Sequence, residues 1–402
     1  MSCGTGKRSP RLLPHARAPI WSLHPRSRTS PISHLFFAIP CAYVLARWLW
    51  PLSIPMAWKA GLGVLLLIGS QYHLWSRLSS GSIFDPEFPR EIVIAFNGLF
   101  GALLILAVLQ ILLDLGLIAT AIVRRGFIGA PDWLRFAMGG TAAILSGIGV
   151  WNAIRVPPVK DVEIAIAGLP PRFDGYRIIQ LTDMHISRLF PATWTRSVVD
   201  RTNAAGADLI VVTGDFIDGS VALRRADVEP LRDLRAPDGV YAIPGNHEYY
   251  FSYPDWMRHL TGMGFRMLPN AHAVLSRGAD RLVLAGVTDL SAPAIGQPGP
   301  DLRAALNGAP QGVPVILLDH QPKLARKAAD AGVALQLSGH THGGMITGLD
   351  RLVAPANNGF VSGRYDLGGM VLYVSNGTAL WPGFALRLGR PSELTRITLR
   401  RR

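Results

Sequence analysis

Two long runs without a charged residue lie in the first 160 residues, and they limit what this part of the chain can fold into. Residues 92–113 are uncharged over 22 positions and residues 136–154 over 19. As an α-helix, either run is long enough to cross the roughly 30 Å of hydrocarbon in a bilayer. Residues 60–76 and 32–50 are weaker candidates, because the first run is shorter and the second contains an arginine and a proline. We therefore predict an α-helical transmembrane region of about four helices over residues 32–155.

Tryptophans support this prediction. They fall near the ends of the proposed spans, where an aromatic belt would place them at the bilayer surface: Trp48, Trp50, Trp58, Trp75 and Trp133. The alternative is a soluble helical bundle that buries the same runs in a core of its own.

Basic residues are concentrated in the same part of the chain. Residues 1–160 hold 15 Lys/Arg and 5 Asp/Glu, whereas residues 161–402 hold 25 and 22. Because the excess charge lies beside the apolar runs, it indicates a membrane surface rather than nucleic acid as the partner. Residues 1–31 contain six Lys/Arg, no acid and several Pro and Ser, so we predict a disordered basic tail ahead of a membrane anchor.

The second part of the chain alternates short apolar runs with helical stretches, a pattern typical of an α/β fold. Five apolar runs of strand length are predicted as strands, at residues 176–182, 208–213, 239–244, 313–318 and 333–338. Helices are predicted over residues 193–204, 255–263 and 321–331. Ligands of α/β proteins bind at the carboxyl ends of strands, so the polar residues that follow these strands are candidate site residues.

Carboxylates, imidazoles and one amide follow the five strands. Asp183 and His185 come after the first strand, where a period of two places both side chains on one side. The others, in chain order, are Asp215, Asp218, Asn246, His247, His320, His340 and His342. A site for two metal ions needs one bridging carboxylate and about three further O or N ligands for each ion. The chain contains that set of ligands.

The order and chemistry of these motifs resemble the calcineurin-like metallophosphoesterase superfamily, whose pattern is D-x-H, G-D-x-x-D, G-N-H-[DE], H and G-H-x-H. The similarity covers roughly residues 161–402. It implies a hydrolase acting on phosphoric ester or phosphoanhydride bonds. It also implies a two-sheet sandwich flanked by helices, in a domain that we place at residues 156–402.

The resemblance also implies a role for each site residue. The ligands of one metal ion would be Asp183, His185 and His342. Those of the other would be Asn246, His320 and His340, and Asp215 would bridge the two. A hydroxide shared by both ions would attack phosphorus while His247 protonates the leaving-group oxygen or stabilises the phosphoryl charge. Asp218 would orient His247, although from the residues alone it could equally cap a helix starting near Val221.

Two neighbouring acids, Glu248 and Asp319, are expected beside the site or at the surface rather than as ligands. Carboxylate and imidazole ligands without a thiolate suit Mn²⁺, Fe or Zn²⁺. Both cysteines, Cys3 and Cys41, lie outside this domain. The resemblance favours two Mn²⁺ ions.

The substrate is expected to be a phosphorylated small molecule or lipid. Membrane-anchored bacterial proteins that this chain resembles include phosphodiesterases and enzymes cleaving the pyrophosphate of UDP-2,3-diacylglucosamine, so a phosphodiester or a pyrophosphate is implied. Asn376 stands where an arginine is expected before Gly377, and specificity here can therefore differ. The alternatives are a metal-binding scaffold without activity and a transporter carrying a regulatory phosphatase. The complete ligand set argues against the first, and the few polar residues in the spans argue against the second.

The basic tail favours an amino terminus inside the cell, and four spans would then place the domain on the cytoplasmic face of the inner membrane. Arg124, Arg125 and Arg135 would lie outside and oppose that assignment. One span fewer would place the domain on the other side.

Overall fold

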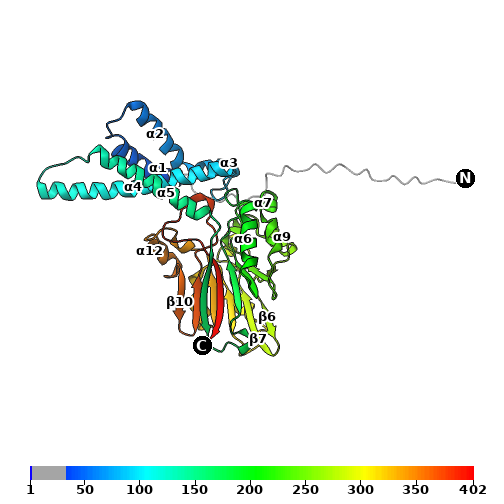
Figure 1. Ribbon diagram of the computed structural model, residues 1–402. Helices are drawn as coiled ribbons and strands as arrows, with labels where there is room; N and C mark the ends of the chain where they lie inside the picture. Colours follow the sequence, from blue (N-terminus) through cyan, green and yellow to red (C-terminus); the bar gives the residue numbers. More distant parts are fainter. Residues whose placement is uncertain (2–32) are drawn as a thin grey trace.

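The computed structural model describes Met1 and residues 33–402, so the tail predicted over residues 1–31 lies outside the described residues except for Met1. Five α-helices precede the first strand and form the part that we call the helical region (Figure 1). They are α1 (Ser33–Val44), α2 (Met56–Ser70), α3 (Tyr72–Ser80), α4 (Arg90–Arg124) and α5 (Asp132–Ile154). A short π-helix, η1 (Leu45–Leu49), continues α1.

Two of these helices are long and apolar enough to cross a membrane: α4 has 35 residues and α5 has 23. Residues 36–49 and α2 are apolar but shorter, so the prediction of further spans there stays a prediction. The second half of α4 exposes large apolar side chains, among them Val108, Ile111, Leu112, Leu115, Ile118 and Ile122. A contiguous apolar surface of this kind marks contact with a membrane or another protein, so α4 is not the buried core helix of the soluble alternative.

Two six-stranded sheets follow the helical region. In the first sheet the strand order is β1 (Val159–Ile166), β12 (Leu394–Arg401), β2 (Arg177–Leu181), β3 (Leu209–Thr213), β4 (Val240–Ile243) and β5 (Arg266–Met267). In the second the order is β10 (Gly363–Leu367), β11 (Met370–Val374), β9 (Leu335–Ser338), β8 (Val315–Leu318), β7 (Asp280–Gly286) and β6 (Ala271–Arg277). This arrangement confirms the predicted two-sheet sandwich.

Both sheets are mixed. Strands β2 to β5 run parallel to one another, and so do β7, β8, β9 and β11. The antiparallel pairs are β12 with β2, β6 with β7, and β10 with β11. The parallel strands direct their carboxyl ends, and the loops that follow, to the same end of each sheet.

The strands are apolar on both sides because each sheet is covered on both faces. In β3, Leu209 and Val211 belong to the core between the two sheets, whereas Ile210 and Val212 belong to the core under the helices. A run buried on both faces lacks the alternation of a half-exposed strand, which is why the predicted strands are continuous apolar runs.

Helices cover the outer faces of the sandwich. The helices after the first-sheet strands are α6 (Ala192–Ala204), α7 (Val221–Val228), α8 (Asn246–Tyr250) and α9 (Tyr253–Gly262). Those after the second-sheet strands are α10 (Leu302–Leu306), α11 (Ala325–Asp330) and α12 (Asp350–Val353). The 3₁₀ turns are η2 (Pro171–Phe173), η3 (Glu229–Asp233), η4 (Ala292–Ile295), η5 (Pro322–Leu324), η6 (His342–Gly344), η7 (Ala354–Asn357) and η8 (Pro382–Phe384).

The helical region caps the end of the sandwich away from the carboxyl terminus (Figure 1). Part of the contact is made by the segment around η8. Pro382 O accepts hydrogen bonds from Tyr72 Oη at 2.7 Å and from Asn97 Nδ2 at 2.9 Å. Leu386 lies in a notch between α4 and α5, where a Cβ on Gly101 or Gly149 would come within 2.4 or 2.6 Å of its side chain. Glycine at both positions gives the leucine the space that it needs.

Candidate metal centre

The loops that follow the strands hold the candidate ligands in unusual backbone conformations. Five of these residues have a positive φ, between 43° and 70°: Asp183, His185, Asp215, His340 and His342. This region of backbone space is unfavourable for residues with a Cβ, and such residues cluster at functional sites, where the surrounding structure holds them. Adjacent loops supply that support, because Asp183 N and His185 N donate to Gly214 O and Asp215 O at 3.0 and 3.2 Å.

Glycines allow the loops to approach one another. Gly214 has φ 92°, and a Cβ there would lie 2.5 Å from Gly245 N and 2.8 Å from His320 Nδ1. A Cβ on Gly339 would lie 2.2 Å from Asp183 Oδ2. A side chain at either position would therefore push a candidate ligand out of place.

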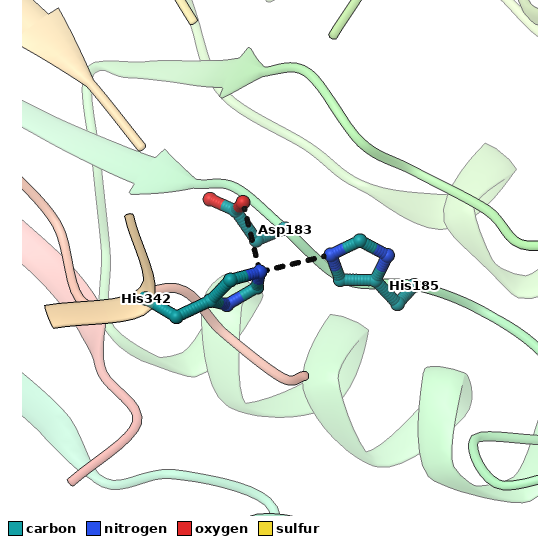
Figure 2. A group of neighbouring side chains, drawn as sticks. All are labelled: Asp183, His185 and His342. Carbon is teal, nitrogen blue, oxygen red and sulfur yellow. Dashed lines mark hydrogen bonds and ion pairs between the residues drawn. The ribbon is translucent and has the colours of Figure 1, made fainter. Parts of the chain in front are cut away.

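One group of candidate ligands consists of Asp183, His185 and His342, all buried (Figure 2). His342 Nε2 lies 3.5 Å from Asp183 Oδ1 and 3.3 Å from His185 Nε2. His185 Nδ1 donates to the Asp218 carboxylate at 3.1 Å, so in the neutral imidazole it is Nε2 that presents a lone pair to the other two side chains. Converging lone pairs repel one another unless a cation lies among them.

The other group consists of Asp215, Asn246, His320 and His340. Asn246 Oδ1 lies 3.0 Å from His320 Nε2 and 2.9 Å from His340 Nδ1. His320 Nδ1 donates to Thr213 O at 2.7 Å, which leaves Nε2 free to face the group. His320 Nε2 also lies 3.2 Å from Asp215 Oδ2. Burial opposes charge on His320, but the Asp215 carboxylate outweighs it and raises the pKa of His320 well above its usual value.

Asp215 connects the two groups. Its Oδ2 is 3.2 Å from His320 Nε2 in one group and 3.8 Å from His185 Nε2 in the other. Its Oδ1 accepts a hydrogen bond from His247 N at 2.9 Å, which fixes the orientation of the carboxylate. The seven side chains offer only oxygen and imidazole nitrogen atoms, the donors that suit Mn²⁺, Fe or Zn²⁺. The potential ligand atoms of seven side chains converge here, six of them buried and His340 partly buried, and this set fits two divalent cations.

His247 and Asp218 lie beside both groups. His247 Nδ1 donates to Asp218 Oδ1, and His247 Nε2 lies 3.9 Å from Asp215 Oδ2. Burial lowers the pKa of His247, but the carboxylates of Asp215 and Asp218 outweigh it and raise that pKa to about 9. Burial acts in the other direction on Asp218, yet His247 and His185 hold its pKa below the usual value. The alternative of a helix cap is not seen, because α7 begins after Ser220 without a side-chain cap.

Glu248 is a support of the site rather than a surface acid. Its carboxylate accepts hydrogen bonds from Gly245 N at 2.7 Å, Phe216 N at 2.8 Å and Asp215 N at 3.1 Å. Burial is the main reason that its pKa is raised to about 8, and the neighbouring Asp215 carboxylate adds to the shift. Asp319 is also buried, where it accepts from Gln336 Nε2 at 3.4 Å.

Arg387 is a residue of this centre that sequence patterns do not reveal. It is 1% exposed, and its guanidinium donates to His342 O at 3.0 Å and to Ala379 O at 3.0 Å, as well as to Asn376 O. Burial lowers its pKa to about 9. The guanidinium, by donating to several carbonyls, holds the loop of His342 in place, but no local motif marks the contact with His342, which is 45 residues away in sequence.

Comparison with known proteins agrees with the geometry. Residues 176–344 match the model of the calcineurin-like phosphoesterase family. The chain is 33% identical over 277 residues to the "Uncharacterized metallophosphoesterase YkuE" of Bacillus subtilis, an alignment that covers 66% of this chain and 94% of that protein. The chain belongs to the calcineurin-like metallophosphoesterases.

Membrane proteins are among its relatives. It is 35% identical over 267 residues to a "Transmembrane protein with metallophosphoesterase domain" of Danio rerio, covering 64% of this chain and 61% of that protein. The protein of the same name in Bos taurus is 36% identical over 268 residues, with 64% and 60% covered. The chain thus spans about three fifths of the length of these two relatives. Residues 176–344 therefore lie in a metallophosphoesterase domain.

Proposed function

We propose that this metallophosphoesterase is a membrane-anchored, metal-dependent hydrolase of a phosphodiester or pyrophosphate, acting through two divalent cations. The observation that carries the proposal is the position of Asp215, whose Oδ2 faces His320 on one side and His185 on the other. A carboxylate between two groups of oxygen and nitrogen ligands is what two neighbouring cations need. When bound, the cation pair would supply an activated water nucleophile and neutralise the charge on the phosphoryl oxygens.

Asp183, His185 and His342 would hold one cation, and Asn246, His320 and His340 the other. The contacts of Asp218 and Thr213 with the far nitrogens of His185 and His320 would keep both imidazoles in the required tautomer. Glu248 and Arg387 would hold the loops that carry these ligands, through backbone amides and carbonyls respectively. Positioning of this kind is worth roughly 10- to 100-fold in metal affinity or activity at metal sites.

His247 would donate a proton to the leaving-group oxygen as its bond to phosphorus breaks. Its Nδ1 is engaged with Asp218, so Nε2 is the nitrogen that faces the reacting groups. The carboxylates of Asp215 and Asp218 raise the pKa of this imidazole, which favours the protonated form that a general acid requires. The attacking water forms the new bond to phosphorus and gives its proton to solvent.

The membrane part of the proposal is supported by the exposed apolar face of α4 and by the printed names of the transmembrane relatives. We place the chain in the inner membrane with several spans and with its enzyme domain on the cytoplasmic face. Anchoring holds the centre close to the bilayer, and a lipid-linked phosphodiester or pyrophosphate is the substrate that such a location favours.

The test is hydrolysis of bis-p-nitrophenyl phosphate and p-nitrophenyl phosphate by the full-length protein in detergent, with Mn²⁺, with Fe²⁺ or Zn²⁺, and with a chelator. We expect turnover that requires metal, is highest with Mn²⁺ and is greater for the diester. Lipid-linked pyrophosphates form a separate arm. If the protein binds two metal ions and hydrolyses none of these compounds, the alternative of a metal-binding scaffold is supported instead.

A further inference from the structure

A loop of the helical region reaches the metal centre. The segment at residues 81–89, which we call the 81–89 loop, joins α3 to α4, and its Phe84 ring lies edge-on to the imidazole of His247 with centroids 5.1 Å apart. Phe84 also stacks on Tyr250 at 5.4 Å and meets Trp381 at 5.5 Å. Residues from three distant parts of the chain thus form one aromatic cluster beside His247.

The cluster, defined as Phe84, Tyr250 and Trp381, faces outwards. Tyr250 is 49% exposed, and Phe84 and Trp381 are both partly exposed. Tyr250 itself lies 5.1 Å from His247, between ring centroids. Aromatic rings left open to solvent beside a catalytic imidazole offer an apolar contact to whatever group binds there.

The 81–89 loop is held firmly enough to place Phe84. Asp85 and Glu87 both pair with the guanidinium of Arg224, which is fully buried. Arg224 Nε in turn donates to Asp218 O at 2.7 Å. Gly219 makes room for this junction, since a Cβ there would lie 2.7 Å from Asp85 Oδ2. Through Arg224, the loop is therefore anchored to Asp218, the residue that contacts His247.

We propose that Phe84, Tyr250 and Trp381 form the leaving-group subsite, that Phe84 is its specificity-determining residue, and that the subsite takes an apolar leaving group. The inference rests on the proposed function, in which His247 protonates the leaving oxygen and therefore lies next to the group that departs. Three uncharged rings around that position favour an aryl or acyl-bearing alcohol over a charged one. The 81–89 loop leads directly into α4, whose exposed apolar face makes a lipid alcohol the natural occupant.

The inference is tested with two diesters that differ in leaving group only, methyl phenyl phosphate and methyl 2-naphthyl phosphate, whose leaving phenols are of similar acidity. Full-length wild-type protein is assayed with Mn²⁺ at one fixed detergent concentration. We expect a higher kcat/KM for the naphthyl ester. In Phe84→Ala this value should fall about five- to tenfold, the worth of a lost aromatic contact, while the phenyl ester changes less than about threefold.

Tyr250→Ala is the second variant, because a half-exposed ring can be removed with little risk to folding. It should lower the ratio of kcat/KM for the naphthyl ester to kcat/KM for the phenyl ester. Phe127→Ala is the matched control, since Phe127 is 98% exposed between α4 and α5, and it should leave both esters unchanged. A dialkyl phosphodiester in mixed micelles, tested against its short-chain soluble analogue, distinguishes a lipid alcohol from a soluble aryl group.

Two results would overturn the inference while leaving the proposed function standing. One is wild-type protein that hydrolyses both esters equally well. The other is an equal loss on both esters in Phe84→Ala, which is what a purely structural role of the loop would cause. Absence of metal-dependent hydrolysis of these esters, of the nitrophenyl esters and of lipid-linked pyrophosphates would instead remove the proposed function and this inference with it.

Discussion

The loops at the strand ends and the 81–89 loop meet at His247, but they bring different kinds of side chain. The strand-end loops contribute charged and imidazole groups that hydrogen-bond one another, with Asp215 and Asp218 both buried. The 81–89 loop contributes the Phe84 ring, and its carboxylates are turned away to Arg224. In the proposed scheme the reacting groups come from the strand-end loops, whereas Phe84, the residue proposed to determine specificity, comes from the helical region, so substitutions should separate the two effects.

The largest effect is expected for Asp215→Asn, which removes the charge that connects the two groups of ligands. Bound metal should fall below two ions per chain, and kcat/KM for the nitrophenyl diester should fall about 10³-fold or more, since a cation is worth several kcal/mol to the transition state. Metal analysis of purified protein and diester hydrolysis measure both. Asp200→Asn, an exposed carboxylate on α6, is the control. Full activity in Asp215→Asn would contradict the assignment.

His247→Gln should keep both metal ions, because His247 is a proton donor in this scheme and not a ligand. Activity on esters with an alkoxide leaving group should fall about 10²-fold or more, the usual worth of a general acid. Nitrophenolate leaves without a proton, so nitrophenyl esters should lose much less. Comparison of kcat on the two ester types is the measurement, with His259→Gln as the control. Equal losses on both would mean that His247 acts otherwise.

Arg224→Met tests the role of the 81–89 loop. It leaves Asp85 and Glu87 without their shared cation and frees the 81–89 loop. Breaking a buried ion pair from one side costs about 3–5 kcal/mol of folding free energy, so the thermal midpoint should drop. Activity should fall about tenfold with metal content unchanged, as for a misplaced positioning element. The exposed neighbour Arg225→Met is the matched control, and a loss of bound metal in Arg224→Met would show that the two regions are not separable.

The smallest effect is a shift in pH dependence. A general acid works only while protonated, so kcat/KM for an alkoxide ester should hold at low pH and fall as pH rises through the pKa of His247. Neighbouring carboxylates raise that pKa to about 9, and bound cations oppose them, so the fall should lie between the usual 6.5 and that value. Asp218→Asn removes one carboxylate, so kcat/KM should begin to decrease at a pH about one unit lower. Saturating Mn²⁺ keeps metal binding constant, and an unmoved profile would exclude Asp218 as the orienting group.

Much of the fold and the chemical part of the site could be predicted from sequence, because both are local in pattern. A buried strand is a continuous apolar run, and β3 is predicted to within a residue of its observed bounds, Leu209–Thr213. Asp183, Asp215 and His320 follow such runs directly, so parallel strands bring them together. The order of the motifs along the chain, rather than any single motif, predicted the ligand set.

The rest depended on contacts between residues far apart in the chain. Strand β12 lies between β1 and β2, and no local signal gives that order. Arg387 sits in a basic carboxyl-terminal stretch that gives no sign of its burial against the His342 loop. Phe84 belongs to a short loop without any motif, and its contact with His247 exists only because two ion pairs and the packing of η8 bring the helical region over the strand ends.

The notch that receives Leu386 has a consequence for how the chain can be divided. Residues of α4 and α5 surround the side chain of Leu386. The next residue, Arg387, donates a hydrogen bond from its backbone N to Gly149 O of α5 at 2.9 Å. A fragment starting after α5 would present Leu386 and Phe384 to water and leave a buried amide without its acceptor. Expression of the enzyme domain alone is therefore expected to give an aggregation-prone protein.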